Sequence, residues 1–301
     1  ARSGMLGAGV SGGVHAMAAL MIVTALVVGS RANAQSAQSS AGTTPTTAPL
    51  VLQLRPRAGD TLRLRIDQTI EMGGTTRAAA DDSIATQMTT LMMLARLAVE
   101  STDADGATVV AVTDSVRIES NDPYQSAVLR SARQMQGQRV RFRVAPDGGT
   151  TLSGGDAWSA GAIGTFLSQL PATLPREAIV PGGTWMRSLD IPLATTADGR
   201  GNATLTATFR FDSLSRSGDF AYLTMKGRLA RSGPMPNGAN GAGGFVQTSG
   251  SVTGNILIDR RRGWIADART IIALRSLVYP KAKDALPVRV RMKITQWMRV
   301  M

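Results

Sequence analysis

Residues 287–300 alternate between two kinds of side chain, and this alternation constrains the fold more than any other feature of the sequence. One parity is apolar except at Gln296, and it comprises Val288, Val290, Met292, Ile294, Gln296, Met298 and Val300. The other parity comprises Arg289, Arg291, Lys293, Thr295, Trp297 and Arg299. Because successive side chains of a strand point to opposite faces, the segment is predicted to be a long strand with one apolar and one basic face. A sheet of such strands buries one side and leaves the other in water.

The same alternation recurs between turn residues along the chain from residue 50 onward. We expect strands at residues 50–55, 61–72, 87–100, 107–120, 138–145, 183–191, 202–214, 219–231, 246–260, 263–279 and 287–300. Two other stretches, 123–136 and 156–170, carry apolar residues at helical spacing after a capping aspartate. The prediction is a mainly β (α+β) fold: a long curved antiparallel sheet or half-barrel of about ten strands, with two helices packed on its concave face.

The first 49 residues are predicted to lie outside the folded domain. Arg2 precedes an apolar run at residues 16–28, and an Ala-Asn-Ala sequence at residues 32–34 is typical of a cleavage site. We therefore interpret residues 1–34 as a secretory signal peptide, with a membrane anchor as the alternative. Residues 35–49 are rich in Ser, Thr and Pro, as in a flexible linker, and residues 50–301 form one β-rich domain. The expected location is the periplasm or the exterior, as a soluble protein after signal cleavage.

The sequence lacks the side chains of several common catalytic centres. It has no Cys and a single His, His15, which lies inside the predicted signal peptide. This excludes Ser-His-Asp and Cys-His catalysis and zinc sites built from His or Cys in the cleaved protein. We expect no catalytic residue, no metal and no cofactor. A hydrolase that uses two carboxylates stays open, because spacing alone cannot pair residues from distant strands.

The positive charge is concentrated near the C-terminus. The formal net charge is +12, and residues 201–301 hold 16 Lys and Arg against 5 Asp and Glu. Four residues on the basic parity, Arg289, Arg291, Lys293 and Arg299, are candidates for contact with an anionic membrane or a lipopolysaccharide surface. The competing interpretation is that any half-solvated sheet needs a charged outer face. Aromatic residues make up 4% of the chain, so no specific nucleic-acid binding is expected.

Several phrases occur in an order that resembles a secreted bacterial family of unknown function. They are LRPRAGDTLRLRIDQ, GQRVRFRVAPDGGTTLSG, LPREAIVPGGTW, FRFDSL and GSVTGNILIDRRRGWI, and together they span most of residues 50–300. Members of this family are broadly similar to the LolA-like and LppX-like lipoprotein-carrier half-barrels. The resemblance implies a long curved β-sheet with helices; the likeness to the carriers is at the level of the fold, and no carrier motif residue is present to assign a role.

Asp114 breaks the pattern of its predicted strand. It shares parity with Val110, Val112, Val116 and Ile118, so an undisturbed strand would turn its carboxylate toward the apolar side. One interpretation is a polar contact inside a ligand cavity. The other is a β-bulge, a strand end or a structural pair with an arginine.

A surplus of small and flexible apolar residues on the inward parity suggests a ligand cavity between the sheet and the helices. The candidates for its lining are Asp114, Met93, Met292, Met298, Trp158 and Phe166. Methionine fills irregular apolar gaps, so core packing is the alternative role for the three methionines. The predicted function is a non-enzymatic periplasmic or secreted binding or carrier protein for an apolar or amphiphilic ligand such as a lipid. The alternative is an envelope-associated structural or interaction protein that contacts anionic surfaces through its basic sheet face.

Overall fold

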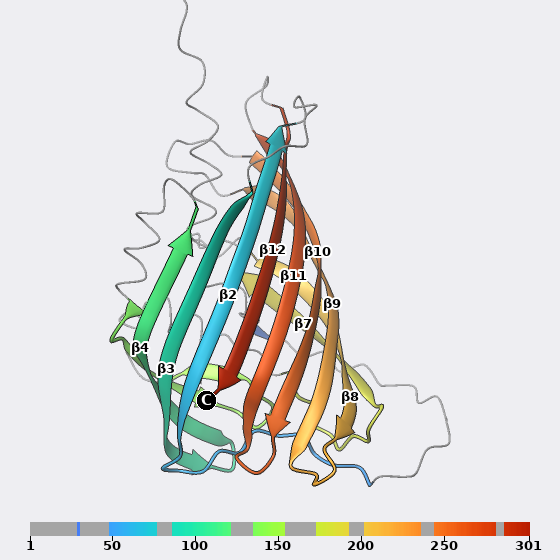
Figure 1. Ribbon diagram of the computed structural model, residues 1–301. Helices are drawn as coiled ribbons and strands as arrows, with labels where there is room; N and C mark the ends of the chain where they lie inside the picture. The colour runs from blue at the N-terminus through green and yellow to red at the C-terminus, as the bar shows by residue number, and fades with distance from the viewer. Residues whose placement is uncertain are drawn as a thin grey trace, which may run out of the picture.

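The computed structural model describes residues 29–30, 48–76, 86–121, 135–153, 173–192, 202–235, 244–280 and 286–301. This part of the chain forms a mainly β structure, drawn in Figure 1. Its strands are β1 (Gly29–Ser30), β2 (Thr61–Thr76), β3 (Gln87–Asp103), β4 (Gly106–Ser120), β5 (Arg139–Val144), β6 (Thr150–Leu152), β7 (Thr184–Pro192), β8 (Asn202–Leu214), β9 (Phe220–Met235), β10 (Gly244–Asp259), β11 (Trp264–Pro280) and β12 (Val288–Val300). The two predicted helices lie almost entirely outside the described residues, as do Trp158 and Phe166.

All twelve strands belong to one open antiparallel sheet. Their order is β1-β7-β8-β9-β10-β11-β12-β2-β3-β4-β5-β6, so neighbours are sequential except where β12 pairs with β2 and β1 with β7. The β12–β2 pair runs from Val288 opposite Thr76 to Val300 opposite Leu64. We call the end of the sheet at Thr76 and Val288 the upper end and the end at Leu64 and Val300 the lower end, as oriented in Figure 1.

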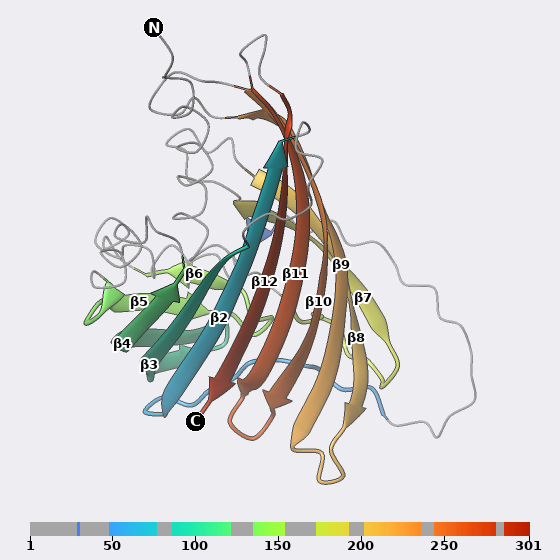
Figure 2. The ribbon, with the colours of Figure 1, turned by 45° about the horizontal axis from the view of Figure 1, so that its top comes forward.

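The sheet curls so that both of its flanks bend to the same side, as Figures 1 and 2 show. The apolar parity of β12 lies inside this curve: Val288, Met292 and Ile294 are buried, whereas Arg289, Arg291 and Lys293 are exposed. One buried cluster includes residues of β3, β5, β8 and β11, which only the inside of the curve can bring together. The prediction of a long two-faced strand at the C-terminus is therefore confirmed.

Residues 48–60 cross the lower end of the sheet as an extended segment, which we call the strap (blue in Figure 1). The expected strand at 50–55 is wrong, because only one isolated bridge forms, between Leu50 and Ile179. The next backbone donors bond to other places, including Arg55 N–H to the carbonyl of Gly263 at 2.9 Å. Leu52 and Leu54 are 2% and 4% exposed, so the strap closes the lower apolar cluster.

Residues 173–183 cross the same end from the β5–β6 turn toward β7. The Leu174 N–H bonds to the carbonyl of Asp147 at 3.0 Å, and Trp185 donates from Nε1 to the carbonyl of Thr173 at 2.7 Å. Trp185 stacks on Phe209 with ring centroids 5.6 Å apart. Among the described segments, the two that cross the concave side thus both lie toward its lower end.

Three strands carry an acidic residue that has no partner in the neighbouring strand. In β3, Val99 pairs with Val109 and Ser101 with Thr108, which leaves Glu100 unpaired. In β8, Asp212 is skipped in the same way, and in β4 the skipped residue is Asp114. Such β-bulges reverse the alternation of the residues that follow them. Each bulge here places a carboxylate on the outer face, where an arginine pairs with it.

Candidate functional site

The upper half of the concave face is an apolar surface built by seven strands. Its buried members are Ile70, Met72, Leu91, Ala203, Leu205, Ala207, Phe209, Leu229, Val252, Ile272, Leu274, Met292 and Ile294. Cross-strand pairing places many of them in continuous rows, such as Leu205, Leu229, Gly250, Leu274, Met292 and Met72. Met72 and Met292 contribute flexible thioether side chains to this surface, and methionine adapts to irregular apolar shapes.

A single polar row separates this cluster from the lower one. Thr270, Gln296 and Gln68 are direct partners across β11, β12 and β2. Gln68 is 3% exposed and Gln296 is 4% exposed, and the buried Oε1 atom of Gln296 has no hydrogen-bond partner among the described residues. A buried carbonyl without a donor destabilises the fold, so the row provides an acceptor to any group that brings a hydroxyl or N–H.

The methionine candidates are divided between the two clusters. Met93 is buried in the lower cluster, and Met298 packs against the same cluster. Met292 belongs to the upper cluster, two residues before Ile294 on the same face. The three residues therefore do not line one site, and Met292 is the one placed on the upper concave surface.

The structure places Asp114 on the outer face, which agrees with the interpretation as a β-bulge paired with an arginine and corrects its place among the candidates for a cavity lining. It is the extra residue of the β4 bulge, between Thr113 opposite Ala95 and Ser115 opposite Leu94. Arg96 Nε donates to both carboxylate oxygens, at 2.8 and 3.0 Å. The bulge and the arginine pair together explain why an acid occupies the apolar parity.

The concave face becomes polar again at its upper end. Arg231 lies opposite Thr248, which in turn lies opposite Ser276 and shares a hydrogen bond with it at 2.8 Å between hydroxyl oxygens. Arg231 is buried, and desolvation lowers the pKa of its guanidinium. A cationic group thus lies at the upper edge of the apolar surface.

On the lower half of the outer face, most basic side chains have acidic partners. Arg65 pairs with Asp67 at 2.8 Å, and Arg141 pairs with Glu100 at 2.8 Å. Asp103 bonds to Arg143, and this hydrogen bond holds the pKa of the Asp103 carboxyl below its usual value. Much of the positive charge on the lower outer face is therefore compensated locally, with Arg63 as an exposed exception among the described residues.

Two of the four anionic-surface candidates take part in such local contacts. The guanidinium carbon of Arg299 lies 4.1 Å from the ring centroid of Trp297, and that of Arg269 lies 4.2 Å from it. Trp297 also donates from Nε1 to Asp267 at 2.6 Å. Lys293 pairs with Glu71 at 3.0 Å. These contacts hold Arg299 and Lys293 in place by cation–π and ionic interactions.

The upper half of the outer face keeps its positive charge. Its exposed basic residues without an ion pair in the described part of the chain are Lys226, Arg228, Arg275, Arg289 and Arg291. We call these five residues the basic patch. Arg275 and Arg291 lie directly opposite each other on β11 and β12. Like charges in directly opposed positions destabilise a sheet, so this pair is unfavourable for folding.

Replacing Arg275 by glutamate is expected to stabilise the protein by about 0.5 kcal/mol, because it converts the repulsive pair into an attractive one. Arg291→Glu should act in the same direction, and the double variant should return close to the wild-type free energy of unfolding. Urea denaturation at low salt, applied to the wild type, the two single variants and the double variant, measures the interaction energy between the two side chains as a double-mutant cycle. Single variants that are less stable than the double variant would contradict the proposed repulsion.

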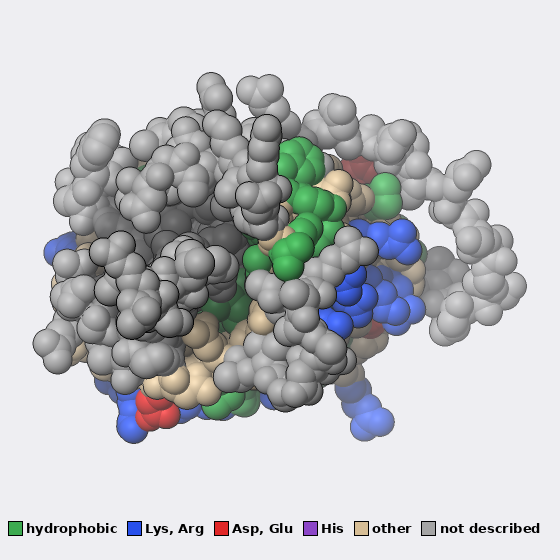
Figure 3. All heavy atoms as spheres, turned by 90° about the horizontal axis from the view of Figure 1, so that it is seen from above, with side chains coloured by type: hydrophobic (Ala, Val, Ile, Leu, Met, Phe, Trp, Pro, Cys, Tyr) green, Lys and Arg blue, Asp and Glu red, His purple; other side chains and the backbone are tan. Residues whose placement is uncertain are grey.

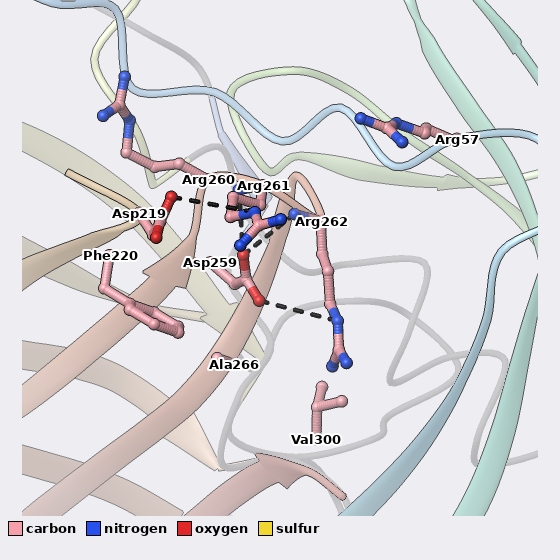
Figure 4. Close-up of a pocket in the computed structure, with 9 residues that line it drawn as sticks. All are labelled: Arg57, Asp219, Phe220, Asp259, Arg260, Arg261, Arg262, Ala266 and Val300. Atoms are coloured by element: carbon pink, nitrogen blue, oxygen red, sulfur yellow. Dashed lines mark hydrogen bonds and ion pairs between the residues drawn. The ribbon is translucent and has the colours of Figure 1, made fainter. Parts of the chain in front are cut away.

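A pocket of about 810 Å³ opens at the lower end, where two hairpin turns meet the strap (Figure 4). It is lined by Arg57, Asp219, Phe220, Asp259, Arg260, Arg261, Arg262, Ala266 and Val300. Asp259 Oδ1 accepts backbone N–H groups of Arg261 and Arg262, both at 3.0 Å. Arg261 approaches Asp219 at 3.9 Å, and Figure 4 shows Arg260 directed away from Asp259. Both carboxylates are engaged by the turns, which favours a structural role for this pocket.

Two negative findings apply to the described residues only. They contain no group of three or more His, Cys, Asp or Glu side chains that could hold a metal ion. They also contain no helix that is both long enough and apolar enough to span a membrane.

Sequence reasoning identified Gln296 as an exception on β12 but did not identify its partner. Gln68 lies 228 positions earlier in the chain, and only the β12–β2 pairing brings the two amides together. The like-charge pair of Arg275 and Arg291 was missed for a related reason, because its detection needs the register of two strands.

The comparisons with known proteins do not establish a family. No protein-family model matches the sequence, and no curated protein matches it. OprB of Pseudomonas putida is 9% identical over 79% of this chain and 94% of that chain, with a TM-score of 0.24. An exported protein with a YmcC-like fold from Bacteroides fragilis is 12% identical over 83% of this chain and 99% of that chain, with a TM-score of 0.16.

An outer membrane channel of Pseudomonas putida F1 is 10% identical over 85% of this chain and 100% of that chain, with a TM-score of 0.19. TM-scores this low carry no argument about the present chain. The resemblance to the lipoprotein-carrier half-barrels and to a secreted family of unknown function thus remains a prediction.

Proposed function

We propose that this chain is an exported, non-enzymatic binding protein that holds an amphiphile against the upper half of its concave face. The ligand's apolar chain lies along the upper cluster, beside Met292 and Ile294. A hydroxyl or amide N–H of the ligand donates to Gln296. Export rests on the predicted signal peptide at residues 1–34.

The observation that carries this proposal is the buried Oε1 of Gln296, which has no donor among the described residues and lies in the polar row that borders the upper cluster. Buried acceptors are nearly always satisfied in folded proteins, and the exceptions call for an explanation. A ligand with an apolar body and one donor satisfies both features of this surface, because binding sites combine apolar linings with a few placed polar groups.

Competition binding tests the proposal with two probes of equal chain length. Dodecanol carries a hydroxyl donor, whereas dodecyl methyl ether carries none, and each is used to displace the fluorescent apolar dye N-phenyl-1-naphthylamine. The wild-type protein should prefer dodecanol by about fivefold, as expected for one hydrogen bond of about 1 kcal/mol. Gln296→Leu should abolish that preference.

The same substitution should raise stability while it removes the preference. Leucine leaves no unsatisfied acceptor, so we expect the free energy of unfolding to rise by about 1 kcal/mol. Gln247→Leu is the matched control, because Gln247 is exposed on the outer face. It should keep the preference for dodecanol. No displacement of the dye by either probe, or a preference that survives in Gln296→Leu, would overturn the proposal.

A further inference from the structure

The upper outer face combines two features that the concave-face proposal does not use. The first is the basic patch, none of whose five members has an acidic residue as its direct cross-strand partner. Two acids on this half, Glu71 and Glu119, are already paired with Lys293 and Arg117. The second is an aromatic pair at the rim: Phe245 lies opposite Tyr279, with ring centroids 6.3 Å apart. Phe245 is 39% exposed and Tyr279 is 38% exposed, although large apolar side chains are normally buried.

We propose that the upper outer face docks on the surface of an anionic phospholipid bilayer. The argument begins with the charge distribution over one continuous sheet. On the lower half, carboxylates pair with Arg65, Arg96 and Arg141, although Arg63 is exposed there without an ion pair among the described residues. On the upper half, Arg275, Arg289 and Arg291 are all exposed without an ion pair in the described part of the chain. A sheet face that needed only solubility would tolerate mixed charges here as well. The uncompensated half therefore matches an anionic partner.

Arginines are also directly opposed on the lower half, Arg63 with Arg96 and Arg65 with Arg299, but there Arg96 and Arg65 pair with Asp114 and Asp67. In the pair of Arg275 and Arg291, neither guanidinium has a carboxylate partner among the described residues. The repulsion between these side chains opposes folding, and each lies on a strand that offers solvent-facing positions for an acid. Phosphate groups arrayed along a bilayer surface would relieve the repulsion from outside the protein. Arginine is well suited to this role, because its guanidinium binds phosphate oxygens in a bidentate manner.

The order of residues along the strands fixes the orientation. On β11, Tyr279 lies nearest the upper end, Arg275 follows, and Ile271 lies farther down and is also exposed. Aromatic rings favour the zone between lipid chains and water, and basic residues favour the headgroups beside it. The rim aromatics should enter the interface while the basic patch contacts the headgroups. Figure 3, viewed from the upper end, shows Lys and Arg side chains gathered beside a strip of hydrophobic side chains.

Vesicle co-sedimentation tests this inference independently of ligand binding on the concave face. The purified protein is mixed with vesicles of phosphatidylglycerol and phosphatidylethanolamine, or with vesicles of phosphatidylcholine alone. We expect partition to the anionic vesicles only, with a loss of at least about tenfold when salt is raised from low to high ionic strength. Dodecanol binding by the same preparation is measured separately. The ligand-binding proposal and the membrane-docking proposal can therefore fail independently of each other.

Two charge-matched double variants locate the contact. The first double variant replaces Arg275 and Arg291 of the basic patch by glutamate. The control double variant replaces Arg55 and Arg216, two exposed arginines toward the lower end, so the net charge changes by the same amount. The first should weaken partition by at least about 30-fold, and the second should change it much less, because headgroup attraction acts through nearby charges. Phe245→Ser should weaken partition by about threefold.

Circular dichroism confirms that each variant is folded before it is compared. Equal losses in the two double variants, or equal partition to phosphatidylcholine, would overturn the inference. Binding that a soluble polyanion such as heparin abolishes while Phe245→Ser leaves it unchanged would also overturn it, since it would indicate a general polyanion site.

Discussion

Gly263→Ala is expected to lower the free energy of unfolding by at least about 3 kcal/mol, because the strap and a hairpin turn touch at this glycine. Gly263 has a φ of +63°, and an added Cβ would lie 2.2 Å from the carbonyl oxygen of Arg55. Its own carbonyl accepts the Arg55 N–H. The alanine methyl must therefore push away the strap that buries Leu52 and Leu54. Urea denaturation followed by tryptophan fluorescence measures the effect.

Gly59→Ala is the matched control for this prediction. Gly59 also lies in the strap and has a φ of +88°, but an added Cβ meets nothing within 4 Å. Its substitution should destabilise by only about 1 kcal/mol, which is the effect of placing a side chain in a left-handed backbone conformation. The difference between the two variants isolates the close contact. Similar losses in both would show that the strap is not held against the turn at Gly263.

The alternation of side chains was sufficient to predict most of the sheet. The predicted strand at 202–214 coincides with β8 (Asn202–Leu214), and the predicted strand at 287–300 matches β12 within one residue. These strands have one wet and one apolar face, so the period of two is visible in the sequence. The three-residue strand β6 was missed because it is too short to show a period.

The errors within strands come from bulges. In an unbroken strand Asp114 would face inward, and the sequence left open both that orientation and a bulge paired with an arginine; the bulge in β4 shifts the count by one and gives the second arrangement. Glu100 and Asp212 occupy equivalent positions in β3 and β8. An isolated acid near the point where apolar parity switches is therefore the local signal of a bulge in this chain. The acid stays exposed to solvent and paired with an arginine. The apolar residues after the bulge return to the buried face of the sheet.

The strap could not be predicted as irregular from its composition. The apolar alternation at Leu50, Leu52 and Leu54 is the pattern of a half-buried strand. Its backbone nevertheless bonds to several separate segments, because it crosses the end of a curved sheet and finds no single neighbour along its length. The alternation of side chains along the strap predicts which of them are buried. Which segments its backbone hydrogen-bonds to depends on contacts with residues far away in the sequence.

The candidate site was only partly visible for the same reason. Met292 was identified on β12, but the surface around it is assembled from strands distributed between β2 and β12. The pocket carboxylates Asp219 and Asp259 come from two different hairpins. No spacing within one strand reports these juxtapositions, since they depend on which strands become neighbours.

The most direct measurement of the two-faced sheet is the labelling rate of single cysteines on β12. The sequence contains no cysteine, so each variant carries one thiol. Met292 is buried on the concave face and Arg291 is exposed on the outer face, one residue away. In the folded protein, a maleimide reagent should modify Arg291→Cys at least about 100-fold faster than Met292→Cys, because the buried thiol reacts only after local opening.

Unfolding in urea should bring the two rates together, which shows that the difference comes from the fold. Lys293→Cys and Ile294→Cys should repeat the contrast one step along the strand. Fast outer and slow inner labelling is the result that the two-faced sheet predicts. Equal rates at Arg291→Cys and Met292→Cys in the folded protein would contradict it.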